Sequence, residues 1–231
     1  MSIFKRSFRD TPYATYLFLL IQSIIFLAMQ ITPAGSTSIK TIVNFGGLYN
    51  PYVTQLHEYW RFITPIFVHI GFYHFLFNAF VLFFLGEQVE NLYGHVRFFL
   101  IYLLSGVSGN ILSFALHNES VSAGASTSLF GMFGAFIILK HYFSHNLVLS
   151  TLARQYTFLV ALNLIFNLFD SSTDIWGHIG GFFSGLLAGI ALAVPKQARY
   201  YRIIERLSAG ILLIIFLVIF LKIGFTKTKF A

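Results

Sequence analysis

Apolar residues along the chain are concentrated in seven long runs, which short polar segments separate. An α-helix that crosses the hydrocarbon core of a bilayer needs about 20 mostly apolar residues, and most of the runs approach this length. The pattern therefore predicts an all-α fold, a polytopic bundle of transmembrane helices. The predicted spans are residues 13–31, 62–85, 98–116, 126–139, 153–169, 175–194 and 209–225.

The polar segments between the spans predict how the chain is organised. Residues 32–61 form one long connection, and its amphipathic part, residues 52–60, ends at Trp60, a residue type typical of membrane interfaces. Residues 1–195 hold six spans and are expected to form the core. Residues 196–231 hold a basic loop and an appended seventh helix, and no soluble module is expected.

The composition favours a membrane protein over a soluble one. Hydrophobic residues make up 57% of the chain and charged residues 10%, whereas an average soluble domain has about 25% charged residues. The chain has no cysteine, which excludes disulfide bonds and thiol catalysis. Its net charge is +7, but the sequence predicts no soluble domain whose surface could carry a basic patch. We therefore expect a lipid bilayer as a partner and no nucleic acid, while the oligomeric state stays open.

The distribution of Lys and Arg predicts the orientation, because short cytoplasmic loops carry an excess of positive charge. With the N-terminus in the cytoplasm, ten of the 15 Lys and Arg residues lie on the inner side. With no recognisable targeting peptide before the first span, we expect an integral, multi-pass protein of a bacterial plasma membrane. The ten inner residues are Lys5, Arg6, Arg9, Arg97, Lys140, Arg154, Lys196, Arg199, Arg202 and Arg206.

Two polar residues open two spans that run in the same predicted direction. Ser126 begins the fourth span, 14 residues before Lys140, which places its hydroxyl roughly 10 Å below the outer surface. His178 lies four residues after Asp174 near the start of the sixth span, about 6 Å inside the same boundary. A serine and a histidine at one depth can act as nucleophile and general base, although each alone also suits ordinary helix packing.

A second polar cluster is predicted on the second span. It consists of His69, His74 and Asn78, of which the last two are i, i+4 neighbours on one helix face. Their side chains can donate hydrogen bonds to an oxyanion, or they can form a polar seam that joins helices. A metal site is the third interpretation of this cluster. We expect no metal, because no carboxylate is nearby and the spacing of His69 and His74 places them on different faces of a helix.

The residues around Ser126 favour close packing and close approach. Gly124 leaves room for a substrate backbone, and Phe130, one helical turn after Ser126, is expected to pack against the ring of His178. Small residues also give the fourth and sixth spans thin faces that would bring these spans into contact. These small residues are Gly131, Gly134, Gly181 and Gly185.

No carboxylate is expected beside His178. Asp170 and Asp174 precede the sixth span and are placed at the surface by the sequence pattern. The residues therefore predict a Ser–His dyad, which should be a slower catalyst than a triad, because the acid of a triad orients and stabilises the imidazolium.

Several short motifs occur in a fixed order between residues 58 and 194. They are Tyr59-Trp60-Arg61, His69, His74, Asn78, Glu90, Gly94, Gly124-x-Ser126, Gly134 and His178-x-x-Gly181-x-x-x-Gly185. In this order they resemble the rhomboid family of intramembrane serine proteases, in its form with six core spans and one more. One departure is Thr127, which stands where the family usually has a glycine.

The resemblance implies a function and a set of roles. Ser126 would be the nucleophile and His178 the general base and acid, while His74, Asn78 and the backbone N–H of Ser126 would form the oxyanion hole. Arg61 would hold the loop before the second span. The expected reaction needs no cofactor and hydrolyses peptide bonds in or near the outer ends of single-span membrane proteins. Substrates would enter from the side, between the second and fifth spans and under the cap formed by residues 170–175, and either element could be the gate.

Two other functions are weighed against this one. A catalytically inactive relative that binds or escorts membrane clients would be marked by the loss of Ser126 or His178, and both are present. A small transporter that uses the histidines as a proton or solute path would be expected to carry acidic residues in its spans, where the chain has none.

Overall fold

The computed structural model describes residues 11–117, 121–169, 174–195 and 200–227, with the backbone alone for residues 163–169. Regular structure in these residues is helical, apart from one isolated antiparallel bridge between Leu48 and Ser122. This confirms the predicted all-α fold. The α-helices are α1 (Tyr13–Ile31), α2 (Ile39–Asn44), α3 (Asn50–Gln55), α4 (Phe72–Val81), α5 (Glu87–Tyr93), α6 (His95–Leu116), α7 (Ser126–Tyr142), α8 (Leu147–Phe169), α9 (Ile175–Leu192) and α10 (Ile203–Lys227).

The long helices confirm an integral, multi-pass membrane protein. Within the described ranges, five helices are long and apolar enough to cross a bilayer: α1, the continuous helix Phe72–Tyr93, α6, α9 and α10. The helix α7 is shorter, with 17 residues, and α8 is apolar over Leu147–Leu162. Every predicted span thus falls on a helix.

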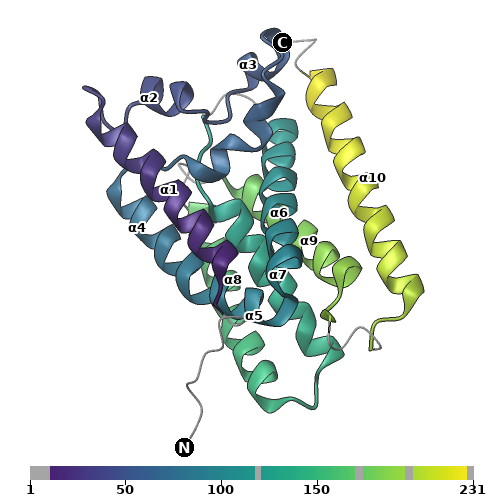
Figure 1. Cartoon of the computed structure of the whole chain (residues 1–231). Helices are drawn as coiled ribbons and strands as arrows, with labels where there is room; N and C mark the ends of the chain where they lie inside the picture. The colour runs from purple at the N-terminus through teal and green to yellow at the C-terminus, as the bar shows by residue number, and fades with distance from the viewer. Residues whose placement is uncertain (1–10, 118–120, 170–173, 196–199, 228–231) are drawn as a thin grey trace, which may run out of the picture.

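Successive long helices run in alternating directions through the bundle (Figure 1). The N-terminal ends of α4, α7 and α9 lie at the end of the bundle that also carries α2 and α3 (Figure 1). The fourth and sixth predicted spans, which correspond to α7 and α9, therefore share one direction, as expected.

The second span begins at Phe72 and not at residue 62, so this predicted boundary is wrong. Residues before it form two short 3₁₀ helices, η2 (Tyr59–Phe62) and η3 (Thr64–Phe67), and Gly71 has a φ of +78° that a continuing helix excludes. After Phe72 the helix continues through α4, one π-helical turn, η4 (Leu82–Gly86), and α5. His69 consequently precedes this helix and does not lie on it.

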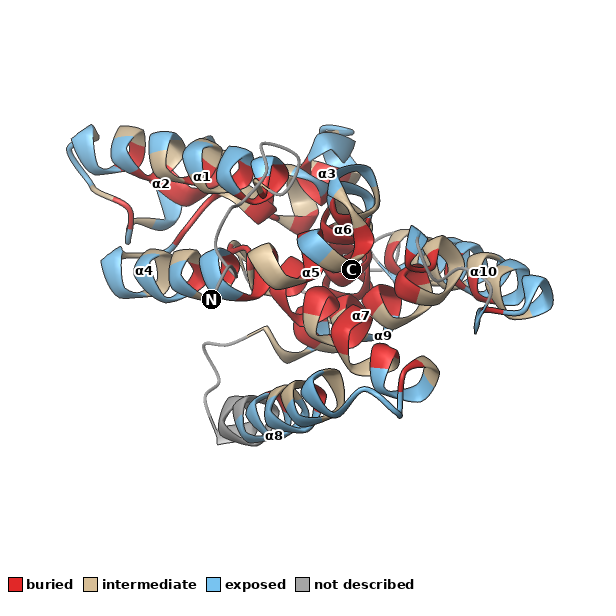
Figure 2. Cartoon of the chain, turned by 60° about the horizontal axis from the view of Figure 1, so that its bottom comes forward, coloured by how far each residue is buried: buried red, intermediate tan, exposed pale blue. Residues whose placement is uncertain are grey.

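The centre of the bundle is formed by α6, α7 and α9, where buried residues are concentrated (Figure 2). Two glycines of α9 lie directly on the backbone of α7. A methyl group on Gly181 would collide with the carbonyl oxygen of Thr127, and one on Gly185 would collide with that of Gly131. The thin faces predicted from the sequence are therefore real, and they hold α7 and α9 in backbone contact.

Glu90 of α5 holds the N-terminus of α1, although 75 residues separate them in the chain. Its buried carboxylate accepts hydrogen bonds from the backbone N–H groups of Ala14 and Thr15, at 2.9 and 2.8 Å, and from the Thr15 hydroxyl at 2.7 Å. The first N–H groups of a helix have no partner within the helix, and a negative charge there is favourable. Glu90 thereby ties α1 to the bundle.

The connection between α1 and the second span is folded around the side chain of Arg61, which is only 3% exposed. Its guanidinium donates to the carbonyl oxygens of Val43 and Gly47, at 2.8 and 2.7 Å, and to the carboxylate of Glu58. It also lies 4.4 Å from the centre of the Trp60 ring, a cation–π distance. These contacts support the anchoring role that the resemblance implies for Arg61.

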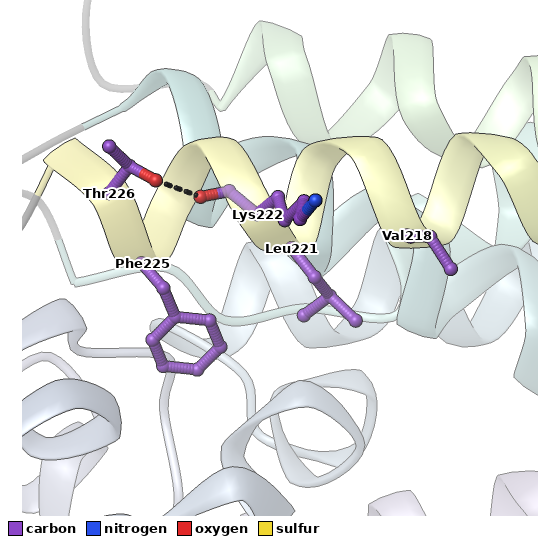
Figure 3. A pocket seen from close by; sticks show the side chains of 5 residues that line it. All are labelled: Val218, Leu221, Lys222, Phe225 and Thr226. Carbon is purple, nitrogen blue, oxygen red and sulfur yellow. Dashed lines mark hydrogen bonds between the residues drawn. The ribbon is translucent and has the colours of Figure 1, made fainter.

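The C-terminal helix α10 packs at the side of the bundle against α6 and α9 (Figure 2). Near its end, the Phe225 ring lies 5.1 Å from that of Phe114 and 5.9 Å from that of Tyr59. A hollow of about 350 Å³ is lined by α10 alone (Figure 3), so it is separate from the polar residues of α7 and α9. Its lining residues are Val218, Leu221, Lys222, Phe225 and Thr226.

Candidate active site

Ser126 and His178 are in direct contact. Ser126 is the first residue of α7, His178 lies in the first turn of α9, and the hydroxyl oxygen is 2.9 Å from Nε2 of the imidazole. The N-terminal ends of α7 and α9, where these residues lie, are at the end of the bundle that carries α2 and α3 (Figure 1). The structure thus brings together the two residues that the sequence argument placed at one depth on helices of one direction.

The segment before Ser126 is held in place by backbone hydrogen bonds. Ser122 pairs with Leu48 in both directions, at 2.8 and 3.0 Å, and the N–H of Gly124 donates to the carbonyl of Pro65 at 2.9 Å. Gly124 has a φ of +140°, which a side chain would strain. The N–H of Ala125 points to Nε2 of His69 at 3.4 Å. These contacts fix where α7 begins and hence where the Ser126 hydroxyl lies.

His178 is enclosed by the bundle and is 6% exposed. The Phe130 ring stacks on the imidazole, with centroids 4.3 Å apart and planes inclined at 14°. This confirms the predicted packing of Phe130. The imidazole therefore has a fixed plane and a fixed distance from Ser126.

Thr127 is accommodated by glycines on two neighbouring helices. It lies in the regular helix α7, and a methyl group on Gly109 or Gly177 would come within 3.0 Å of its side chain. A helical backbone does not need glycine at this position. The departure from the family pattern therefore leaves the backbone beside Ser126 unstrained.

Of the two predicted oxyanion donors, His74 lies beside the Ser126 site. A methyl group on Gly124 would be 2.6 Å from Cε1 of His74 and 3.5 Å from the Ser126 hydroxyl oxygen, so glycine alone permits this approach. The Asn78 side chain is buried, and its amide donates to the carbonyl of His74 at 2.8 Å. Asn78 thus holds the helix turn that carries His74.

The expectation that His69 and His74 lie on different faces of one helix is wrong. Their rings are neighbours, with centroids 5.5 Å apart, because the chain between them turns at Gly71 before the helix starts. Among the described residues, no group of three His, Cys, Asp or Glu side chains comes together as a metal site would require.

The expectation that Asp174 lies at the surface is also wrong. Its side chain is 14% exposed, and its carboxylate accepts from the Ser122 hydroxyl at 2.8 Å and from the Gly177 N–H at 2.9 Å. It is therefore the N-cap of α9, four residues before His178. The sequence signal that was missed is an acidic residue directly before an apolar run. Asp170 lies outside the described residues.

Electrostatics at Asp174 favour the charged carboxylate. Burial raises the pKa of this carboxyl group, but the polar interactions with His117, Ser113, the Gly177 N–H and Ser122 outweigh burial and leave the pKa below its ordinary value. In return, the interaction with the nearby Asp174 carboxylate raises the pKa of His117, against the effect of burial. When His117 is protonated, the two groups form an ion pair at the entrance to α9.

The fold and the Ser–His contact define a polytopic membrane protein with a serine and a histidine in hydrogen-bond contact inside its bundle. Comparison with known proteins gives the family: the Rhomboid domain model matches residues 56–195. The chain belongs to the rhomboid family.

The chain covers a different share of the length of each relative. The chain is 38% identical over 92% of its length to "Rhomboid protease GluP" of Bacillus subtilis (strain 168), but spans 41% of that protein. It is 34% identical over 76% of its length to "RHOMBOID-like protein 1" of Arabidopsis thaliana, spanning 45% of it. It is 30% identical over 85% of its length to "Putative rhomboid protease YdcA" of B. subtilis, spanning 96% of it. The chain thus spans less than half of the first two relatives and nearly all of the third.

Proposed function

We propose that this protein is an intramembrane serine protease that cleaves single-span membrane proteins in or near their outer ends. The observation that carries the proposal is the 2.9 Å contact between the Ser126 hydroxyl and Nε2 of His178, enclosed in a membrane bundle. Polar groups inside a membrane are costly, so their presence there indicates a function. Two relatives that are named rhomboid proteases support the same class of activity.

In the proposed reaction, Nε2 of His178 takes the hydroxyl proton as the Ser126 oxygen attacks the substrate carbonyl carbon. The resulting tetrahedral oxyanion is stabilised by the Ser126 backbone N–H, which is free of an intrahelical partner at the start of α7, and by the His74 side chain. His178 then gives its proton to the leaving amine, and the C–N bond breaks. Water attacks the acyl-enzyme with His178 again as base, which releases the acid and restores the Ser126 hydroxyl.

Asn78 has a supporting role in this scheme. Its amide donates to the backbone of His74, so it sets the position of the His74 ring. A direct contact of Asn78 with the oxyanion would require its amide to turn away from that carbonyl. Loss of Asn78 is therefore expected to act through His74.

The bundle surface supports a substrate that arrives within the membrane. The helix α4 has an outward face of large apolar side chains, including Tyr73, Phe77 and Phe80, each more than half exposed. The helix α8 makes its main contacts with α7 and few with α9. A substrate helix that approaches between α4 and α8 would meet apolar surface until it reaches the N-terminal end of α7.

The proposal is tested with the full chain reconstituted in liposomes together with a single-span reporter protein whose fragments are mapped by mass spectrometry. We expect one cut near the outer end of the reporter span, and no cut with Ser126→Ala or His178→Ala. Cleavage that persists with Ser126→Ala contradicts the proposal. Reporter binding without any cleavage by the parent protein would indicate the escort function instead.

A further inference from the structure

Asp174 connects three segments that meet at the proposed active site. Its Oδ1 caps α9 through the Gly177 N–H at 2.9 Å and lies 3.8 Å from Nδ1 of His117, at the end of α6. Its Oδ2 accepts from the Ser122 hydroxyl at 2.8 Å. Ser122 lies four residues before Ser126, and Asp174 lies four residues before His178. One carboxylate therefore joins the chain segments that lead into both members of the pair.

The contacts of Asp174 are built into the fold. A methyl group on Gly177 would lie 2.8 Å from Oδ2 of Asp174, so a glycine there makes room for the carboxylate. Ser122 is itself fixed, because its backbone pairs with Leu48 in both directions. The carbonyl of Asp174 also accepts from the His178 N–H at 3.2 Å, which carries its position directly into the first turn of α9.

We propose that Asp174 is a positioning residue that sets the distance between Ser126 and His178 by tying the start of α9 to the segment that enters α7. This inference rests on the proposed protease function. The carboxylate of Asp174 is engaged with Ser122, Gly177 and His117, so Asp174 acts through these segments and not directly on the reacting atoms. From outside the Ser–His dyad, Asp174 helps to align His178, as the acid of a catalytic triad aligns its histidine.

The proposal distinguishes two consequences of changing Asp174. A purely structural residue would lower the fraction of folded protein, whereas a positioning residue lowers the rate at which each folded molecule reacts. Misplacement of a reacting group by about 1 Å can cost on the order of a hundredfold in rate. The rate constant and the final extent of active-site labelling separate the two cases.

The test follows the reaction of a fluorescent phosphonate with the full chain in detergent micelles, for the parent, Asp174→Ala, Asp174→Asn and Ser122→Ala. We expect Asp174→Ala to reduce the saturating rate constant by about tenfold to a hundredfold, with the final labelling per chain and the half-saturating concentration unchanged. Ser122→Ala removes one of the ties and should reduce the rate by less. Asn is a good N-cap: its amide oxygen can accept from the Gly177 N–H and its amide NH₂ can donate to the Ser122 hydroxyl oxygen, so Asp174→Asn keeps both ties and should stay close to the parent.

Several results would overturn the inference. Parental rate constants in both Asp174→Ala and Ser122→Ala would do so, as would a reduced extent of labelling at an unchanged rate. If Asp174→Ala does not fold, Ser122→Ala and the rescue by Asn decide the question. Ser126→Ala is included throughout, and a parent that does not label at all contradicts the proposed function itself and not this inference.

Discussion

The ring of Phe130 lies nearly parallel to the ring of His178, with centroids 4.3 Å apart and planes inclined at 14°. Phe130 follows Ser126 by one turn of α7, so the hydrogen bond and the stack both reach His178 from the same helix. The plane of the imidazole is thereby fixed by packing, while Asp174 fixes the start of its helix.

Removal of this stack should slow catalysis without abolishing it. An aromatic pair contributes about 0.5–1.5 kcal/mol beyond the area it buries, so we expect Phe130→Ala to reduce the cleavage rate by roughly two- to tenfold. The measurement is the rate of reporter cleavage in liposomes. Phe216→Ala removes a ring of the same size from α10 and should leave the rate unchanged; equal losses in both variants would count against the orienting role of Phe130.

The backbone contact between α7 and α9 should not tolerate a single methyl group. Gly181→Ala places that methyl against the carbonyl oxygen of Thr127, which pushes α9 away from α7 and moves His178 away from Ser126. We expect a destabilisation of about 1–3 kcal/mol and a loss of cleavage on the order of a hundredfold. The matched control is Gly210→Ala in α10, where a methyl meets nothing within 4 Å. Full activity of Gly181→Ala would show that the close contact is not required.

Arg61 should not be replaceable by lysine. The guanidinium donates to two buried carbonyl oxygens from one planar group, and an ammonium cannot keep this geometry. Each buried acceptor left without a partner costs about 1–3 kcal/mol, so Arg61→Lys should lower the midpoint of thermal unfolding. Arg154→Lys, at an exposed position on α8, is the control and should leave the midpoint unchanged. A midpoint for Arg61→Lys equal to that of the parent would contradict the anchoring role.

The ion pair of His117 and Asp174 should make stability depend on pH. The nearby Asp174 carboxylate raises the pKa of His117 above its ordinary 6.5, so the contribution of His117 to stability is full below pH 6.5 and is lost as the pH rises through the raised pKa. The pKa of Asp174 is lowered below 3.8, so its contribution is lost only in stronger acid. We expect His117→Gln to lower the unfolding midpoint at pH 5 and to have less effect at pH 9. If the difference in unfolding midpoint between His117→Gln and the parent grows with pH, the predicted direction is contradicted.

The sequence predicted helix positions well where polar residues bound an apolar run. The first span was placed at residues 13–31, where the structure has α1, because polar segments bound this apolar run on both sides. The second span was started too early, because Phe62, Ile63, Ile66 and Phe67 are apolar and periodicity cannot distinguish 3₁₀ turns packed on a bundle from a spanning helix. The turn at Gly71 was the available signal.

Contacts between distant segments explain what the sequence could not reveal about the site. The sequence could pair Ser126 with His178, because the known rise of a helix gives the depth of each residue and the order of the spans gives their direction. The junction at Asp174 depends on where Ser122 lies in space, and Ser122 is held by Leu48 from a loop 74 residues earlier. Such a link follows only from the folded chain, as does the capping of α1 by Glu90.

The central claim is that Ser126 is a nucleophile activated by His178. Its most direct measurement is the reaction of a serine-directed phosphonate with the purified full chain, followed by mass spectrometry of the labelled peptide. The account predicts one adduct per chain, located on Ser126, and no adduct in Ser126→Ala or His178→Ala. A parent protein that stays unlabelled, or an adduct that persists in Ser126→Ala, would contradict it.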